Sequence, residues 1–269
     1  MRRWEYRVFK YLRVYKILAI HNFSTLVFSR LDFWTLILGK LIRMGFMLIW
    51  ILSIFNFIPK LSGYSKGQTL LFFATFNLID ILAQVFFFRG FWFIQRWVKE
   101  GEFDRILTYP INPIFTTAFR ITDWMDVLTL IPAFGLLIYT IGLLNTNLTL
   151  GGLFFYILLI INGLFIAFAL NLFIAAATLY TTETANIFWL YRDLMYTGRF
   201  PTDIFNNFLR LFFTFVMPVA VIIAFPTKAL LGLLTWRGLL YAVSLSFFLN
   251  ILSYKFWKSS LKRYASVSS

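Results

Sequence analysis

The densest group of ionisable side chains in the sequence lies in one stretch, residues 96–113. Three bases and three acids alternate there within ten residues: Arg96, Lys99, Glu100, Glu102, Asp104 and Arg105. Such a group cannot lie in hydrocarbon, because each unpaired charge there costs several kcal/mol. It therefore faces water or a protein partner. Pro110 and Pro113 follow and end one helix before another begins, since proline lacks the N–H donor.

A second group of polar side chains lies inside a long apolar segment. Asn77, Asp80 and Gln84 are spaced by three and four residues, which places them on one face of a helix. That face indicates a pore lining or a contact with another helix. Asp80 is either a functional acid, the default for an acid at this depth, or a protonated acid bonded to a neighbouring helix.

Other ionisable residues fall within or near the ends of apolar segments. Asp123 and Asp126 are three residues apart and share a helical face, and Arg43 lies at a similar depth. Arg43 with Asp123 or Asp126 forms either a structural pair or a vestibule of a transport path. For Lys40 and Arg89 we expect long side chains that extend to the membrane interface.

The chain lacks the usual groups of an active site. It has no cysteine and a single histidine, His21, so it offers neither a thiol nucleophile nor a cluster of nitrogen and sulfur ligands for a metal. It also lacks the glycine-rich loop with Lys and Ser or Thr that holds the phosphates of ATP. We therefore expect no enzymatic activity, no metal and no cofactor in this chain itself.

The composition is typical of a protein embedded in the lipid bilayer. Hydrophobic residues make up 60% of the 269 residues and charged residues only 13%, whereas soluble domains are nearer half apolar and a quarter charged. The formal charge of +14 reflects basic flanks that fix the orientation of a membrane protein. We expect no nucleic-acid partner.

Hydropathy predicts an all-α polytopic membrane protein with six spans in one domain, residues 1–269. Residues 1–30 are basic and aromatic and predict an amphipathic helix on the membrane surface, and residues 258–269 form a basic tail. Residues 226–236 are apolar but too short to span, so they form a short outer element, unless the neighbouring helices extend into them. The predicted spans are residues 31–58, 67–94, 114–144, 153–180, 205–225 and 238–257.

Basic residues predict the orientation of these spans. Eighteen of the 25 bases lie on the side of the two termini, which includes the loop between the fourth and fifth spans, and four lie on the opposite side. Bases collect on the cytosolic side of membrane proteins. We therefore expect both termini and residues 96–113 to be cytosolic.

The central stretch resembles the signature of a known family. Gly101-Glu102-x-Asp104-x-x-Leu107-x-x-Pro110-x-Asn112-Pro113, between the second and third spans, resembles the motif of ABC-2 type permeases, in particular a bacterial branch of undefined substrate. The whole layout, from the basic N-terminal helix to the short tail, is similar as well. The family more often has Leu-Arg where this chain has Thr108-Tyr109.

The resemblance implies the permease subunit of an ATP-binding cassette transporter, most often an exporter, in the bacterial inner membrane. Such a permease pairs with a second permease, identical or paralogous, and is driven by separate ATPase subunits that hold ATP and magnesium. The ATPase would contact a coupling loop made of Glu100, Gly101, Glu102, Asp104, Arg105, Pro110, Asn112 and Pro113. The candidate translocation path or intramembrane polar network comprises Arg43, Asn77, Asp80, Gln84, Asp123 and Asp126.

Two other functions compete with this one. A proton- or ion-coupled secondary transporter would use Asp80 with Asp123 and Asp126 as intramembrane carboxylates. A membrane enzyme is disfavoured, because one histidine and no cysteine cannot supply a nucleophile with its base.

Overall fold

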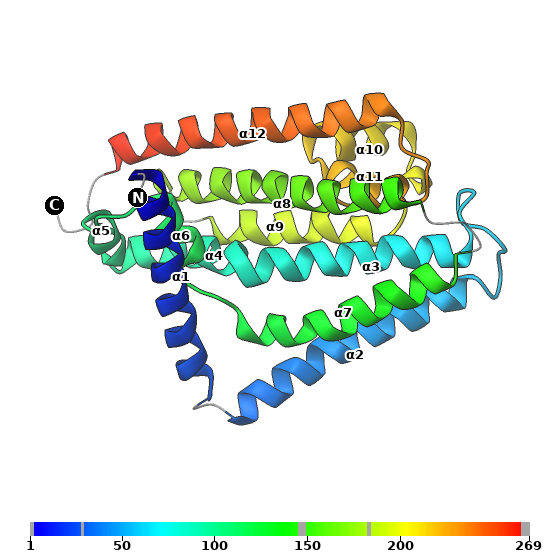
Figure 1. Ribbon diagram of the computed structural model, residues 1–269, viewed down its shortest axis with the longest axis horizontal. Helices are drawn as coiled ribbons and strands as arrows, with labels where there is room; N and C mark the ends of the chain where they lie inside the picture. Colours follow the sequence, from blue (N-terminus) through cyan, green and yellow to red (C-terminus); the bar gives the residue numbers. More distant parts are fainter. Residues whose placement is uncertain (1–2, 28–29, 145–148, 182–183, 265–269) are drawn as a thin grey trace.

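The protein folds into an elongated bundle of helices (Figure 1). The computed structural model describes residues 3–27, 30–144, 149–181 and 184–264, and no strand occurs among them. Among these described residues, five helical segments are long and apolar enough to cross a membrane. They are α2 (Arg30–Ile54), α3 (Lys66–Ala83) continued through a wide turn at Gln84–Phe88 into α4 (Arg89–Lys99), α7 (Trp124–Gly142), α8 (Leu150–Thr178) and α12 (Trp236–Arg263). The expected all-α polytopic membrane fold is confirmed.

Local sequence determines where these helices begin. Ser65 caps α3 in a reciprocal arrangement with Gln68, and Thr149 and Thr235 accept hydrogen bonds from the first turns of α8 and α12. Such caps satisfy backbone N–H groups that have no partner within the helix. In the middle of the bundle, α3 is covered by the other helices, and 78% of the residues in the most apolar part of α3 with α4 are buried. Helix α8 is buried on one side only and exposes Phe154, Ile161 and Phe165 on the other.

The two ends of the bundle differ. At one end, here called the α5 end, α4 leads into the short helices α5 (Glu102–Leu107) and α6 (Pro113–Phe119), and α8 and α12 finish (Figure 1). At the opposite end, here called the outer end, α2 turns into α3 and α7 leads towards α8. These ends define the two faces that the bundle presents to water on either side of a membrane.

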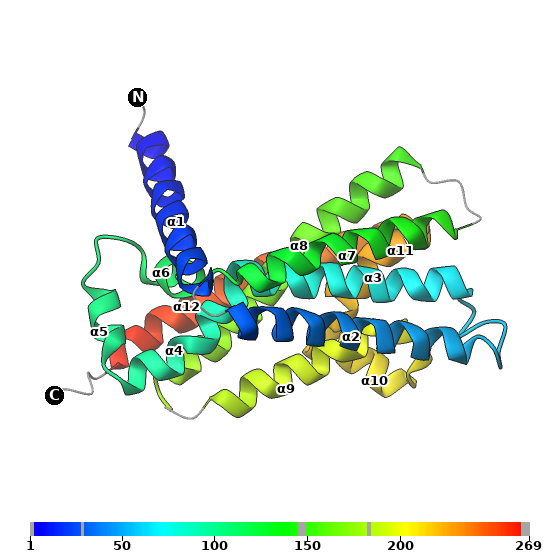
Figure 2. The ribbon, with the colours of Figure 1, turned by 90° about the horizontal axis from the view of Figure 1, so that it is seen from below.

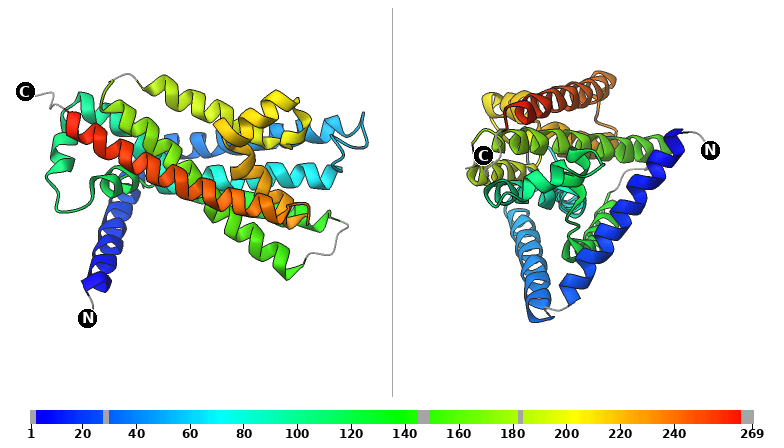
Figure 3. Two further views of the ribbon diagram at one scale, coloured as in Figure 1. Left: turned by 90° about the horizontal axis from the view of Figure 1, so that it is seen from above. Right: turned by 90° about the vertical axis from the view of Figure 1, so that its left-hand side faces the viewer.

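Helix α1 (Arg3–Val27) lies across the α5 end, roughly perpendicular to the long helices (Figures 2 and 3). Tyr15 packs edge-on against Phe119 of α6, and the backbone carbonyl of Ala19 accepts a hydrogen bond from Trp124 of α7. The opposite face exposes apolar side chains, including Phe9 and Ile20. A helix with an unpaired apolar face, perpendicular to the spans, has the geometry of one that lies in the membrane interface.

The fifth passage along the bundle is not residues 205–225, as predicted, but α9 (Ala185–Tyr196) with the short turns Thr197–Arg199 and Thr202–Ile204. Phe188 packs against Trp92 near the α5 end, and Phe200 contacts Trp50 of α2. The Tyr64 hydroxyl, in the loop at the outer end, donates to Asp203 at 2.8 Å. The segment predicted to be a cytosolic loop therefore carries the chain from one end of the bundle to the other.

Residues 207–230 form a bent pair of helices that enters and leaves at the outer end. The first arm is Asn207–Val216, comprising α10 (Asn207–Leu211) and a wide turn, and the second is Ala220–Leu230, which ends in α11 (Phe225–Leu230). The arms meet at 83° near Pro218. Lys228 in the second arm pairs with Asp203, just before the first, at 2.8 Å. This ion pair ties both ends of the pair together, so it is re-entrant.

Asp203 is the polar centre of this attachment. Burial works against its charged form, but the hydrogen bonds from Lys228 and Tyr64 hold the pKa of the Asp203 carboxyl below its ordinary value. The predicted short outer element at residues 226–236 is thus the last part of a longer structure. Its break is at Pro218, where proline removes a backbone donor.

The third span also begins later than predicted, at Trp124 instead of residue 114. Asn112 caps α6 by accepting from the N–H of Ile114, with Pro113 in its first turn. Asp123 starts α7 separately by accepting from the N–H groups of Met125 and Asp126. Two caps eleven residues apart divide the predicted span into a short helix at the α5 end and a spanning helix.

The re-entrant arrangement predicts on which side of the membrane Asn207 lies. This chain has no cysteine, so single cysteines can be labelled cleanly with a membrane-impermeant maleimide. We expect Asn207→Cys to react from the same side as Lys60→Cys, at the outer end, and not with Lys99→Cys at the α5 end. All three side chains are exposed. Vesicles of both orientations would be tested. If Asn207→Cys reacts in the same vesicles as Lys99→Cys, residues 205–225 are the fifth span after all.

Candidate functional site

The α5 loop, residues 100–113, projects from the end of the bundle (Figure 1). Helix α4 ends at Lys99, and Gly101 takes a positive φ of 73° before α5. Such a φ is unfavourable for residues with a Cβ, so this glycine permits the sharp turn. The loop then returns through Pro110 to α6. The predicted coupling-loop residues therefore lie in one continuous turn at one end of the molecule.

Helix α5 is anchored by its apolar face. Phe103 and Ile106 are fully buried, and the Phe103 ring packs edge-on against Trp257 and Tyr264 at centroid distances of 6.2 and 5.3 Å. Burial, reinforced by the carboxylate of Asp104, raises the pKa of Tyr264 to about 12. The loop is thus attached to the end of α12.

The acids of the loop are paired within the chain. Glu102 accepts from Arg105 at 2.8 Å and lies 3.8 Å from Arg120, while Glu100 pairs with Arg96 at 2.8 Å. The most exposed part of the loop is instead its tip, from Arg105 through Leu107 and Tyr109 to Pro110. Sequence reasoning emphasised the acids and missed this apolar tip, although the signal was present where Thr108-Tyr109 departs from the motif.

Helix α1 supports the same loop from the side. The ammonium of Lys10 donates to the carbonyl of Pro110 at 2.8 Å. The Tyr11 hydroxyl accepts from the N–H of Asn112 at 3.3 Å, and its ring contacts Phe115 at 4.7 Å. These contacts fix the angle at which the loop enters α6.

A second polar group lies inside the bundle, where the acids at the start of α7 meet bases from α2 and from the start of α4. Lys40 Nζ is 2.6 Å from Asp126 Oδ1 and 4.0 Å from Asp123 Oδ2. Arg89 Nε donates to Asp123 Oδ2 at 2.7 Å. Both carboxylates are almost completely buried. The expectation that Lys40 and Arg89 extend to the interface is therefore wrong, because each has an acidic partner within reach.

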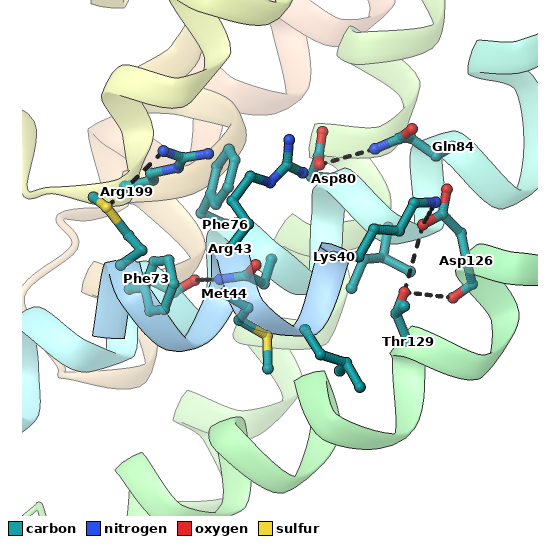
Figure 4. A pocket seen from close by; sticks show the side chains of 14 residues that line it. Lys40, Arg43, Met44, Phe73, Phe76, Asp80, Gln84, Asp126, Thr129 and Arg199 are labelled. Carbon is teal, nitrogen blue, oxygen red and sulfur yellow. Dashed lines mark hydrogen bonds and ion pairs between the residues drawn. The ribbon is translucent and has the colours of Figure 1, made fainter. Parts of the chain in front are cut away.

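The polar face of α3 meets this group in a cavity of about 40 Å³, which is room for a few water molecules. Figure 4 shows Lys40, Asp126 and Thr129 on one side, with Arg43 extending beside Phe76 towards Asp80 and Gln84. Gln84 donates to Asp80 at 3.0 Å. The structure thus brings the predicted network together around one space; the cavity is lined by Arg43, Asn77, Asp80, Gln84 and Asp126, with Asp123 adjacent through Lys40.

Comparison with known families identifies the chain. A family model described as "ABC-2 family transporter protein" matches residues 41–268. The chain belongs to this ABC-2 transporter family. The match extends over all the described elements from the second half of α2 onward and confirms the predicted resemblance of the chain to ABC-2 type permeases. Among proteins of curated function none matches, and no solved structure matches either.

Membership of the ABC-2 family makes this chain a multi-pass membrane protein and the permease component of an ABC transporter. Permeases of this type are transport subunits. No group of three His, Cys, Asp or Glu residues that could hold a metal occurs in the described part of the chain.

One alternative from the sequence was a structural pair of Arg43 with Asp123 or Asp126. In this ABC-2 chain Arg43 pairs with neither acid. Its Nη1 instead lies 3.4 Å from the Tyr196 hydroxyl, and its guanidinium carbon is 5.8 Å from the centroid of the same ring. Lys40 and Arg89 already occupy the two acids. Arg43 is therefore available on the other side of the cavity, next to α9.

Proposed function

We propose that this chain is the membrane subunit of an exporter in the bacterial inner membrane, working as a dimer and driven by separate ABC ATPase subunits that bind ATP and magnesium. The observation that carries the proposal is the α5 loop, a rigidly supported turn that projects from the end of the bundle in a chain of the ABC-2 family. Because Phe103 ties the loop to α12, a push on its tip would tilt a spanning helix.

The distribution of bases supports a cytosolic position of this loop and of both termini. Among the described segments, α1, the start of α2, residues 96–120 and the last part of α12 carry fourteen bases at the α5 end. The outer end carries five: Lys60, Lys66, Arg210, Lys228 and Arg237. Moving the fifth span to α9 therefore keeps the predicted orientation.

We place the ATPase-docking surface at the exposed tip of the α5 loop, because Glu100 and Glu102 are already paired within the chain. We expect the double change Arg105→Glu with Tyr109→Ala to reduce ATPase binding at least about tenfold, because it removes an aromatic anchor and reverses a charge that would meet the partner. The measurement is recovery of ABC ATPase subunits with the tagged permease from native membranes, together with ATP hydrolysis. Both side chains are exposed, and the one ion pair that the change breaks, between Arg105 and Glu102, is an exposed pair worth about 0–1 kcal/mol, so the variant should still fold.

Arg237→Glu, a charge reversal at the outer end, is the matched control and should recover the ATPase at the wild-type level. Equal recovery with the tip variant would show that residues 105–110 do not dock the ATPase. Recovery of no ABC ATPase by the wild-type chain would reject the proposed driving subunit.

An ion-coupled carrier remains the alternative because of the buried acids. Asp126 Oδ2 is buried without a hydrogen-bond partner in the structure, and Asp80 lines the same cavity. Flux driven by a proton gradient in vesicles without ATP would support this alternative, and flux that requires ATP and the partner would support the exporter.

A further inference from the structure

Three arginine side chains from different elements converge on one tyrosine inside the bundle. Arg192 Nη2 donates to the Tyr196 hydroxyl at 2.7 Å, and Arg43 Nη1 approaches the same oxygen at 3.4 Å. The guanidinium carbon of Arg199 lies 4.1 Å from the centroid of the Tyr196 ring and 5.1 Å from that of Phe76. Helices α2 and α9 and the turn after α9 thus place three positive charges around a single ring.

These positive charges exceed the acids around them. No carboxylate of the described residues forms an ion pair with Arg43, Arg192 or Arg199, while the buried acids Asp123 and Asp126 are taken by Lys40 and Arg89. Asp80 in the cavity wall and the exposed Asp193 on α9 are the acids that remain nearby. Three guanidiniums against two unpaired carboxylates leave a positive surplus.

The surplus lies where charge is costly. Arg43 is exposed in the middle of α2, a helix whose flanks are apolar, and the Nε atom of Arg199 is buried without a hydrogen-bond partner in the structure. Cation–π contacts offset part of the cost, at roughly 0.5–2 kcal/mol each. An uncompensated buried donor and like charges at this depth nevertheless call for an anion.

The surroundings indicate what kind of anion fits. Arg43 and Arg199 line the cavity between α2, α3 and the turn after α9, and the rest of that wall is largely apolar, with Met44, Met47 and Phe73. Arg192 does not line the cavity. It positions the Tyr196 hydroxyl by donating a hydrogen bond to it. The cavity itself has room for a few water molecules only, so a ligand would place its charged group against the two guanidiniums at the cavity mouth. Its apolar body would lie outside, along the face of α2 that carries the exposed side chains of Arg43 and Phe46.

We propose that Arg43 and Arg199, positioned by Tyr196 and Arg192, bind the anionic group of an organic anion with an apolar body, such as a carboxylate, sulfonate or phosphate. This assignment names the substrate class and rests on the proposed transport function. Planar guanidiniums suit such groups because they donate two parallel hydrogen bonds.

The test uses naphthalene-2-sulfonate as the probe and the full-length permease in phosphatidylcholine nanodiscs, without ATPase or ATP. Calorimetry should show binding to the wild type and affinity at least about tenfold weaker for Arg43→Gln and for Arg199→Gln. The uncharged naphthalene-2-sulfonamide should not bind. Arg237→Gln, exposed at the outer end, is the matched control and should bind as the wild type does.

Several outcomes would overturn the proposal: no binding of the sulfonate by the wild type, equal binding of the sulfonamide, or unchanged affinity in both cavity variants. If the wild type does not bind the sulfonate and Asp193→Asn no longer forms a dimer, the arginines instead pair with Asp193 of a second copy of this chain. Two variants on separate elements guard against misfolding of one, which thermal unfolding would reveal.

A separate part of the experiment identifies the source of the anion. Competition by phosphatidylglycerol in the nanodisc would identify a lipid anion, and unchanged sulfonate binding would identify one that arrives from water; either result keeps the site. Because binding is measured on the permease alone, its failure is distinguishable from failure of ATPase recovery.

Discussion

Replacing Asp123 by alanine is expected to lower the free energy of unfolding by about 4 kcal/mol. The change leaves the Arg89 guanidinium without its 2.7 Å partner. Breaking a buried pair costs about 3–5 kcal/mol, and the lower end applies here because the Arg89 side chain is 40% exposed. It also removes the cap of α7, since Asp123 accepts from Met125 and Asp126, and loss of a cap costs roughly 1 kcal/mol. Thermal unfolding in detergent measures the sum.

Two comparisons separate these contributions. Asp123→Asn keeps an oxygen for the cap but loses the charge, so it should fall between the wild type and the alanine variant. Glu100→Ala breaks an ion pair of the same type, with Arg96, but both side chains are about half exposed or more. Exposed pairs are worth about 0–1 kcal/mol, so this control should be nearly neutral. Equal losses in Asp123→Ala and Glu100→Ala would show that the buried pair contributes nothing special.

Much of the fold follows from features that are local in sequence. Long apolar segments bounded by caps can be recognised in the sequence, because hydropathy and capping act within a few residues. The segment that begins after Ser65 is an example. Helix α9 does not, because its twelve residues include Arg192 and Asp193. Their polarity lowers hydropathy, yet the arginine is accommodated inside protein by Tyr196 and by the ring of Phe88. A span lined by protein need not be apolar all round, so composition alone assigned it to a loop.

The candidate site was predictable to the extent that it depends on spacing. Asn77, Asp80 and Gln84 share a face because of helical periodicity, and the structure places all three on one cavity. The pairing of Lys40 with Asp126 joins residues 86 positions apart, and no periodicity relates α2 to α7. Helix packing decides which base pairs with which acid. The sequence alone therefore indicated Arg43 as a partner for Asp126 as readily as Lys40, which forms the pair.

That packing depends at one point on a glycine. Gly90 lies in the first turn of α4, where α6 crosses it. A Cβ at this position would stand 2.2 Å from the carbonyl oxygen of Thr117 and 2.3 Å from that of Ala118. These are among the last carbonyls of α6, which have no partner within their own helix. The two backbones therefore touch at this position, and no flexible side chain can move aside.

We expect Gly90→Ala to destabilise the protein by about 3 kcal/mol, the upper range for overpacking, because a backbone must shift. The matched control is Gly135→Ala in α7, where an added Cβ meets nothing within 4 Å; alanine there should stabilise the helix by roughly 0.5–1 kcal/mol. The two variants add the same methyl group and should change the midpoint of thermal unfolding in opposite directions. Because α6 carries the return of the α5 loop, Gly90→Ala should also displace the loop tip and weaken ATPase recovery. If Gly90→Ala unfolds at the same temperature as Gly135→Ala, the close contact between α4 and α6 does not exist in the folded protein.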